Sequence, residues 1–138
     1  MTITETRSVT FPSLKENVAL VEKYIDEICQ FYSIGDENYG NILVAVTEAV
    51  SNAIYHGNRL NPDKSVLFFY ETKDNNLCFT VEDQGKGYNP DTLPDPTDPE
   101  NLENPNGRGV FLMRKLTDDI KFHKDGSKVE LYFRIANQ

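Results

Sequence analysis

The stretch TEAVSNAIYHGN, residues 47–58, decides the fold of this chain. We predict that it ends a helix that begins at a cap formed by Asp36 and stops near Gly57. The apolar residues that repeat at helical spacing are Ile42, Val46, Ala49, Val50 and Ala53. Glu48 and Asn52 lie four residues apart, so their side chains stack on one helix face beside this apolar stripe.

This carboxylate and amide pair has the chemistry to bind a metal ion and to accept a proton. The neutral oxygen of Asn52 suits a single bond to Mg²⁺ while phosphate and water oxygens complete the octahedron. Glu48, one turn earlier, can accept a proton from an attacking hydroxyl or water. Taken alone, the pair is better explained as a solvated helix face, so its meaning depends on what converges with it.

The segments around this helix predict a sheet with further helices. Residues 7–11 alternate like a strand that Pro12 stops, and Ser13 with Glu16 forms a capping box for a helix running through Ile28. Further strands are expected over residues 65–72, 77–83, 120–123 and 128–135, the last two joined by a hairpin turn at 124–126. The predicted fold class is α/β, a two-layer α/β sandwich. Its mixed, mostly antiparallel sheet carries helices on one face and a partly solvated second face, in one domain over residues 1–138.

A second group of candidate residues follows the 77–83 strand, in the sequence VEDQGKG. Asp83 closes the strand, and Gly85 and Gly87 allow a flat ligand to approach the backbone. A carboxylate held at a strand end can accept the hydrogen bond that the exocyclic amine of adenine offers. An unpaired donor costs about 1–3 kcal/mol, enough to discriminate adenine from guanine. A tight surface turn is the alternative explanation of this motif.

A third group is NGRG, residues 106–109, which we expect to open a helix running through Leu116. Gly107 and Gly109 at a helix start leave N–H groups and the positive dipole end free to hold phosphate. Between these two groups, residues 88–106 form a long loop rich in proline and acidic residues, which its length marks as functional. The motif is neither a Walker A loop nor a dinucleotide fingerprint.

Charge and composition limit the possible functions. The net charge is −8, from 14 basic and 22 acidic residues, so direct nucleic-acid binding is disfavoured and a polyphosphate must be held by a metal or by backbone N–H groups. We see neither an export signal nor an apolar stretch long enough to span a membrane, so the expected location is cytoplasmic. Cys29 and Cys78 sit in apolar patterns and are expected to be buried thiols.

In this order, the three motifs resemble the GHKL (Bergerat-fold) ATP-binding superfamily, over roughly residues 41–135. The resemblance implies ATP and Mg²⁺ as ligands. Glu48 and Asn52 then correspond to the N box. Asp83, Gly85 and Gly87 match the first glycine box, and Gly107 and Gly109 match the second. Residues 88–106 match the ATP lid, and Ser127 matches the small hydroxyl residue that supports the adenine-binding carboxylate. Lys86 and Arg108 are the alternatives for the basic contact to phosphate.

Within the superfamily, size and the string EAVSNAIYHGN look most like the anti-sigma factor serine/threonine kinases. That similarity implies a homodimer that sequesters a sigma factor and phosphorylates a small anti-anti-sigma antagonist, with Glu48 as the catalytic base. A nucleotide-dependent binding switch with little or no transfer needs the same pocket and stays open. A detached histidine-kinase catalytic domain is less favoured because the helix before the N box contains no histidine. A non-nucleotide α/β domain would make all three motifs coincidental.

Overall fold

The computed structural model describes residues 7–85 and 105–135. Its elements are one sheet of five strands and three longer helices, with a π-helical turn and a 3-10 turn. In chain order they are β1 (Arg7–Pro12), α1 (Asn17–Phe31), α2 (Asp36–Asn52), the π-turn η1 (Ala53–Gly57), β2 (Ser65–Lys73), β3 (Asn76–Glu82), α3 (Pro105–Leu116), β4 (Asp119–His123), the 3-10 turn η4 (Lys124–Gly126) and β5 (Lys128–Arg134).

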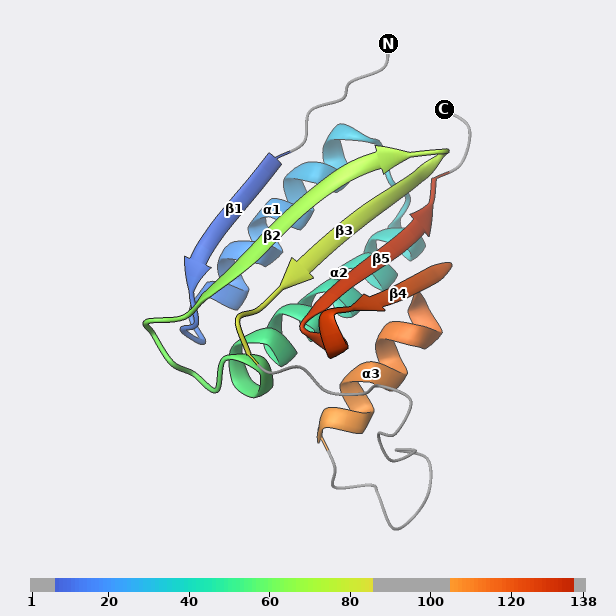
Figure 1. Cartoon of the computed structure of the whole chain (residues 1–138). Helices are drawn as coiled ribbons and strands as arrows, with labels where there is room; N and C mark the ends of the chain where they lie inside the picture. Colours follow the sequence, from blue (N-terminus) through green and yellow to red (C-terminus); the bar gives the residue numbers. More distant parts are fainter. Residues whose placement is uncertain (1–6, 86–104, 136–138) are drawn as a thin grey trace.

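The sheet has the strand order β1-β2-β3-β5-β4. All four pairs in the described residues are antiparallel, so the predicted antiparallel character is confirmed and no parallel pair is found among them. The three helices cover one face of the sheet, with α2 between α1 and α3 (Figure 1). The predicted two-layer α/β sandwich is therefore confirmed. No helix within the described ranges is long and apolar enough to cross a membrane.

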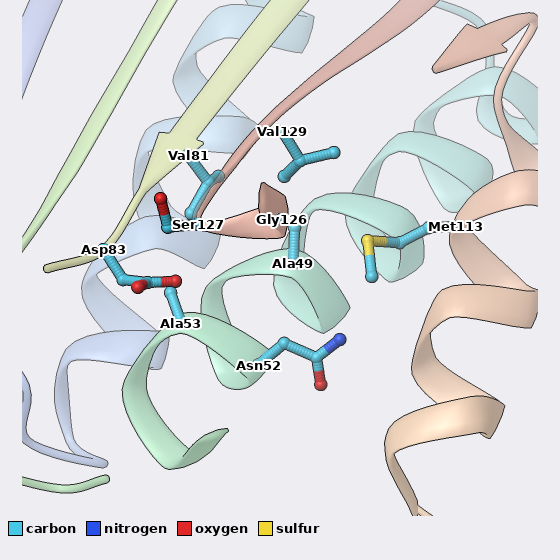
Figure 2. Close-up of a pocket in the computed structure, with 9 residues that line it drawn as sticks. All are labelled: Ala49, Asn52, Ala53, Val81, Asp83, Met113, Gly126, Ser127 and Val129. Carbon is cyan, nitrogen blue, oxygen red and sulfur yellow. The ribbon is translucent and has the colours of Figure 1, made fainter. Parts of the chain in front are cut away.

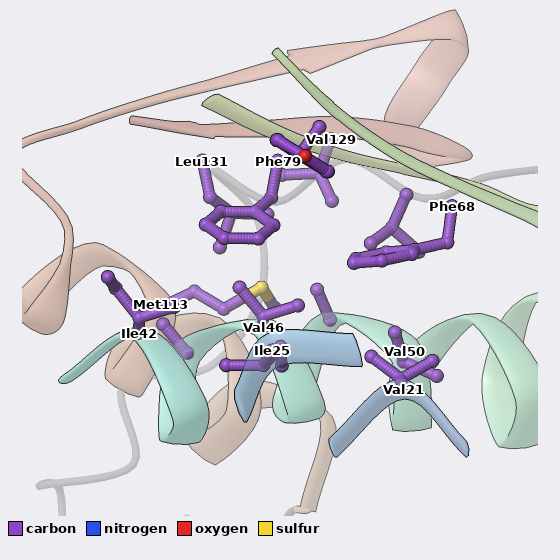
Figure 3. Close-up of a cluster of buried hydrophobic side chains, with 14 of the residues drawn as sticks. Val21, Ile25, Ile42, Val46, Val50, Phe68, Phe79, Met113, Val129 and Leu131 are labelled. Atoms are coloured by element: carbon purple, nitrogen blue, oxygen red, sulfur yellow. The ribbon is translucent and has the colours of Figure 1, made fainter. Parts of the chain in front are cut away.

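The core lies between the sheet and the helices. Val21 and Ile25 of α1 and Val46 of α2 meet the stacked rings of Phe68 and Phe79, whose centroids are 6.0 Å apart (Figure 3). Every second residue of β2 and β3 faces this layer, because side chains alternate across a strand. In the sheet, β3 lies over α2, and the strand ends beside the last turn of that helix (Figure 1).

The second face of the sheet is less solvated than expected at its centre. Cys78 and Thr80 of β3 are 0% exposed, and Tyr132 of β5 is 8% exposed. The amine of Lys121 lies 5.1 Å from the centre of the Tyr132 ring, so long side chains on neighbouring strands cover the smaller ones. Both cysteines are buried free thiols, as predicted.

The N-caps predicted for α1 and α2 are wrong. Ser13 does not cap α1: its hydroxyl donates to the Lys64 carbonyl at 2.6 Å, and Glu16 occupies the N-cap position without a side-chain cap bond in the described structure. The hydroxyl is buried, so a distant backbone acceptor competes with the local one. Similarly, Gly35 rather than Asp36 is the N-cap of α2, and Asp36 is the first helical residue.

The helix predicted to open at Gly107 begins at Pro105 instead. Proline is favoured in the first turn because its missing N–H has no helical partner to lose. Gly107 therefore lies in the first turn and Gly109 within the helix. Of the predicted lid, residues 88–104 lie outside the described residues, as do Lys86 and Gly87.

Candidate functional site

The site is a pocket between the end of α2, the ends of β3 and β5, and α3 (Figure 2). Asn52 lines it from the last turn of α2, and Asp83 lines it from the residue after β3. The other lining residues are Ala49, Ala53, Val81, Met113, Gly126, Ser127 and Val129. Its enclosed part measures about 10 Å³, which is room for one water molecule and makes it the floor of a site rather than a space for a whole ligand.

Asp83 is held by the backbone on both sides. Its own N–H donates to the Ser127 carbonyl at 2.8 Å, and its carboxylate oxygen Oδ1 accepts from the Gly85 N–H at 2.7 Å. The first bond continues the β3–β5 ladder by one residue, so the sheet itself fixes the position of Asp83. The second bond closes a short turn in which the carboxylate points back along the chain.

The Asp83 carboxylate is an acceptor in a poorly solvated place. Only 9% of the residue is exposed. Burial raises the pKa of Asp83 from 3.8 to about 6, and the nearby Glu82 charge raises it too, while the Gly85 N–H and the Lys64 charge lower it. At neutral pH the group is therefore mainly ionised, yet burial makes a hydrogen-bond donor from a ligand valuable to it.

Gly57, at the end of the π-turn, packs directly on this carboxylate. A Cβ built on Gly57 would lie 2.3 Å from Cγ of Asp83, which is far inside any allowed contact. A side chain at residue 57 would thus push Asp83 out of its place. In the sequence Gly57 is recognisable only as a helix end, and the signal for a further role is its position just after the Glu48 and Asn52 motif.

Glu48, Asn52 and Gly109 meet at the α2–α3 contact. A Cβ added to Gly109 would lie 3.1 Å from Nδ2 of Asn52 and 3.2 Å from Oε2 of Glu48. Gly109 is buried, and both polar side chains are half-buried. The lack of a side chain on Gly109 thus lets α3 approach the polar face of α2 closely.

The structure brings most of the predicted site residues together. Asn52, Asp83 and Ser127 line the same pocket. The Gly85 N–H donates to the Asp83 carboxylate, and Gly109 packs against both Glu48 and Asn52. Gly107 lies in the first turn of α3, where N–H groups have no partner within the helix, and Arg108 follows it directly. Gly87 lies outside the described residues.

The support that Ser127 gives differs from the expectation. Its hydroxyl donates to the Lys124 carbonyl at 2.9 Å and so closes the 3-10 turn, while its carbonyl, not its hydroxyl, bonds Asp83. This hydrogen bond from Asp83 is therefore independent of the side chain at residue 127. Met113 was also missed as a lining residue, because its apolar side chain reads as core.

Within the described residues, no three His, Cys, Asp or Glu side chains gather as a metal site would require. The polar groups of α2 nearest to a Cβ built on Gly109 are the Asn52 amide, through both its nitrogen and its oxygen, and the Glu48 carboxylate. This donor set fits Mg²⁺, which keeps several waters and binds through few protein ligands plus substrate phosphates.

Comparison with known proteins identifies the family. The profile of the family described as "Histidine kinase-like ATPase domain" matches residues 11–135. The chain therefore belongs to this GHKL-like family of ATPase domains.

The relatives that it resembles in sequence include proteins named serine-protein kinase RsbW. The protein from Oceanobacillus iheyensis is 23% identical over 118 residues, which cover 81% of this chain and 75% of that protein. The one from Staphylococcus epidermidis is 24% identical over 121 residues, covering 83% and 76%.

A solved structure shares the fold. It contains the RsbU and RsbW domains of Rv1364c from Mycobacterium tuberculosis and superposes with a TM-score of 0.64 at 14% sequence identity. The match covers 95% of this chain and 32% of that longer chain. At this identity the likeness establishes the fold alone.

Proposed function

We propose that this chain is an ATP-dependent protein serine/threonine kinase of the anti-sigma type, which sequesters a sigma factor and phosphorylates a small anti-anti-sigma antagonist. One observation carries the proposal: the buried Asp83 carboxylate and the Asn52 amide line one pocket, and Gly109 packs against both Asn52 and Glu48. The proposed adenine acceptor Asp83 and metal ligand Asn52 thus share a pocket, and the proposed base Glu48 lies one helical turn from Asn52. The names of the relatives, serine-protein kinase RsbW, support the reaction class.

Each site residue has a proposed role in holding the nucleotide. Asp83 accepts the hydrogen bond of the adenine amine, and Gly85 and Gly87 let the ring approach the backbone. Ser127 anchors Asp83 through its carbonyl. The residues proposed to hold the phosphates are Gly107, Arg108 and Gly109, the first two through the positive start of α3.

Asn52 is the proposed ligand of Mg²⁺, which when bound would neutralise charge on the β- and γ-phosphates. The neutral amide adds no further negative charge to a chain that already carries −8. This matters because an acidic protein must otherwise repel a triphosphate.

Glu48 is the proposed catalytic base. The serine or threonine oxygen of the target forms a bond to the γ-phosphorus, and its proton passes to the Glu48 carboxylate. The bond between the γ-phosphorus and the β–γ bridging oxygen breaks, and ADP leaves with that electron pair. Most of the acceleration in such transfers comes from positioning and charge stabilisation.

We further propose that residues 1–138 work as a single cytoplasmic domain that forms a homodimer without direct nucleic-acid contact. A net charge of −8 opposes binding to a phosphate backbone. The sigma factor is then regulated through protein contacts.

The test compares the wild type with Glu48→Gln. Both are incubated with labelled ATP and a small-protein fraction captured on the chain from lysate. We expect Glu48→Gln to keep its Mg·ATP affinity and to lose about 100-fold or more of the transfer rate to serine or threonine. Glu37→Gln, in the exposed first turn of α2, is the matched control and should transfer at the normal rate.

Two outcomes would contradict the proposal. Near-normal transfer by Glu48→Gln would show that Glu48 is not the base. ATP-dependent capture of a partner with no label transferred by the wild type would favour the nucleotide-dependent binding switch instead.

A further inference from the structure

Asn58 ends the motif that decides the fold, yet it is absent from the lining of the pocket described above. It follows the π-turn directly and is only 1% exposed. A π-turn widens the helix by one residue per turn and often marks a functional place. Here it carries the chain from Asn52, on the metal-binding side, toward the turn that holds Asp83.

Every polar group of the Asn58 side chain has a partner. Its Oδ1 accepts from the Gln84 N–H at 2.8 Å. Its Nδ2 donates to the Ser65 carbonyl at 2.9 Å and to the Ser13 hydroxyl at 2.7 Å. The orientation of the amide is fixed by these groups, because Gln84 offers only a donor and Ser65 only an acceptor.

The partners are themselves tied together. The Ser65 N–H donates to Oε1 of Gln84 at 2.7 Å, so β2 and the Asp83 turn hold each other by a second bond. The Ser13 hydroxyl, which is fully buried, donates a hydrogen bond to the Lys64 carbonyl. Asn58 is thus the centre of a satisfied polar network that joins four segments, and such networks make a local structure rigid and unique.

We propose that Asn58 is a positioning residue for nucleotide recognition, which fixes the Asp83–Gly85 turn to the end of α2 and so sets where the adenine-reading carboxylate stands relative to Asn52. The inference rests on the proposed function of this pocket as an ATP site. Without the Asn58 amide, Gln84 loses the acceptor of its N–H. The turn that carries Asp83 then keeps its bonds to Ser127 and Ser65 but loses this hydrogen bond to the end of α2. Adenine discrimination then weakens more than phosphate binding does.

The experiment measures three affinities in the presence of Mg²⁺: for ATP, for purine riboside triphosphate, which lacks the exocyclic amine, and for inorganic tripolyphosphate. The wild type should prefer ATP over the purine analogue by about tenfold or more. In Asn58→Ala this ratio should fall toward one, while tripolyphosphate affinity changes by less than about twofold.

Two further variants separate positioning from stability. Ser13→Ala disturbs the same network but leaves the bond from Gln84 to Asn58 in place, so it should lower the unfolding midpoint and keep the ATP preference. Asn61→Ala removes the side-chain acceptor of the Asp63 N–H, at 2.9 Å within the same loop, and should behave as the wild type.

Amide hydrogen exchange of the unliganded wild type keeps the test decisive if Asn58→Ala does not fold. A protected Gln84 N–H together with the unchanged ratio in Ser13→Ala supports the proposal, and an unprotected Gln84 N–H overturns it. A folded Asn58→Ala with the wild-type ratio also overturns it and leaves the proposed function standing. A wild type that does not bind ATP would instead remove the proposed function, and this inference with it.

Discussion

Gly85 lies against the carbonyl group of Gly57, so that a Cβ added to Gly85 would stand 2.0 Å from that oxygen. The turn after β3 and the π-turn after α2 are therefore in backbone contact. This contact explains why two segments that are 28 positions apart in the sequence form one wall of the site.

Gly85→Ala should separate these two segments. Because the added methyl group meets a backbone atom and not a mobile side chain, relief requires the turn to move. We expect a loss of about 1–3 kcal/mol in the free energy of unfolding. Mg·ATP affinity should fall at least about tenfold. Denaturant unfolding and titration calorimetry measure the two effects.

The control is Gly40→Ala. Gly40 lies within α2, and a Cβ there would meet nothing within 4 Å. This variant should stabilise the protein by about 0.5–1 kcal/mol, since alanine favours a helix, and should bind ATP normally. If Gly85→Ala matched the wild type in both measurements, the backbone contact would be absent in solution.

Gly109→Ala should affect the metal end of the site and spare the adenine end. Its methyl group would crowd Asn52 and Glu48 at 3.1–3.2 Å, a distance that small side-chain shifts can absorb. We expect Mg·ATP to bind about tenfold more weakly while adenosine affinity changes by less than about twofold. Calorimetry with both ligands checks this, and equal losses for both would contradict it.

Asp83→Asn should stabilise the protein without nucleotide in a pH-dependent way. The pKa of Asp83 is raised from 3.8 to about 6, so folding favours the protonated form and its ionisation costs stability as pH rises between these values. Above pH 6, the free energy of unfolding of the variant should exceed that of the wild type by about 1–2 kcal/mol.

Unfolding curves of both proteins near pH 4 and near pH 8 test this difference. The gap between them should be small at the lower pH and reach its full value at the higher one, while Mg·ATP binding by the variant is lost at both. A gap that shrinks as pH rises would contradict the assignment of a destabilising buried carboxylate.

Ser33→Gly should stabilise the end of α1. The Ile34 N–H donates to the Cys29 carbonyl at 2.9 Å and the Ser33 N–H to the Gln30 carbonyl at 3.1 Å, which is a Schellman ending. Ser33 has φ of 55°, a conformation that glycine adopts more easily. We expect a gain of about 0.5–1 kcal/mol on thermal unfolding. Ser33→Ala, which keeps the Cβ, should bring no gain.

The two cysteines should be unreactive in the folded protein. Burial raises the pKa of both the Cys29 and Cys78 thiols to about 11, so hardly any thiolate forms near neutral pH. A colorimetric thiol reagent should therefore label neither residue until guanidinium chloride unfolds the chain. Rapid labelling of one thiol under native conditions would show that its surroundings open.

Much of the fold followed from local pattern. Leu77, Phe79 and Val81 alternate as a strand over a helical layer, and Glu48 with Asn52 falls on one helix face by spacing alone. The errors arose where a side chain could choose between local and distant partners. The sequence predicts Ser13 as a helix cap, but its hydroxyl donates a hydrogen bond to the Lys64 carbonyl, 51 positions away.

Local sequence patterns were enough to predict the strands, the two-layer arrangement and the order of the motifs, because periodicity and glycine spacing act over a few residues. The tertiary structure alone decided that Gly57 packs on Asp83, that Asn58 clamps Gln84, and that Gly109 meets Asn52. These contacts join segments far apart in the chain. Their distances depend on the antiparallel sheet, which brings the turn after β3 to the end of α2. No local preference encodes such a meeting, so it becomes visible only once the sheet has formed.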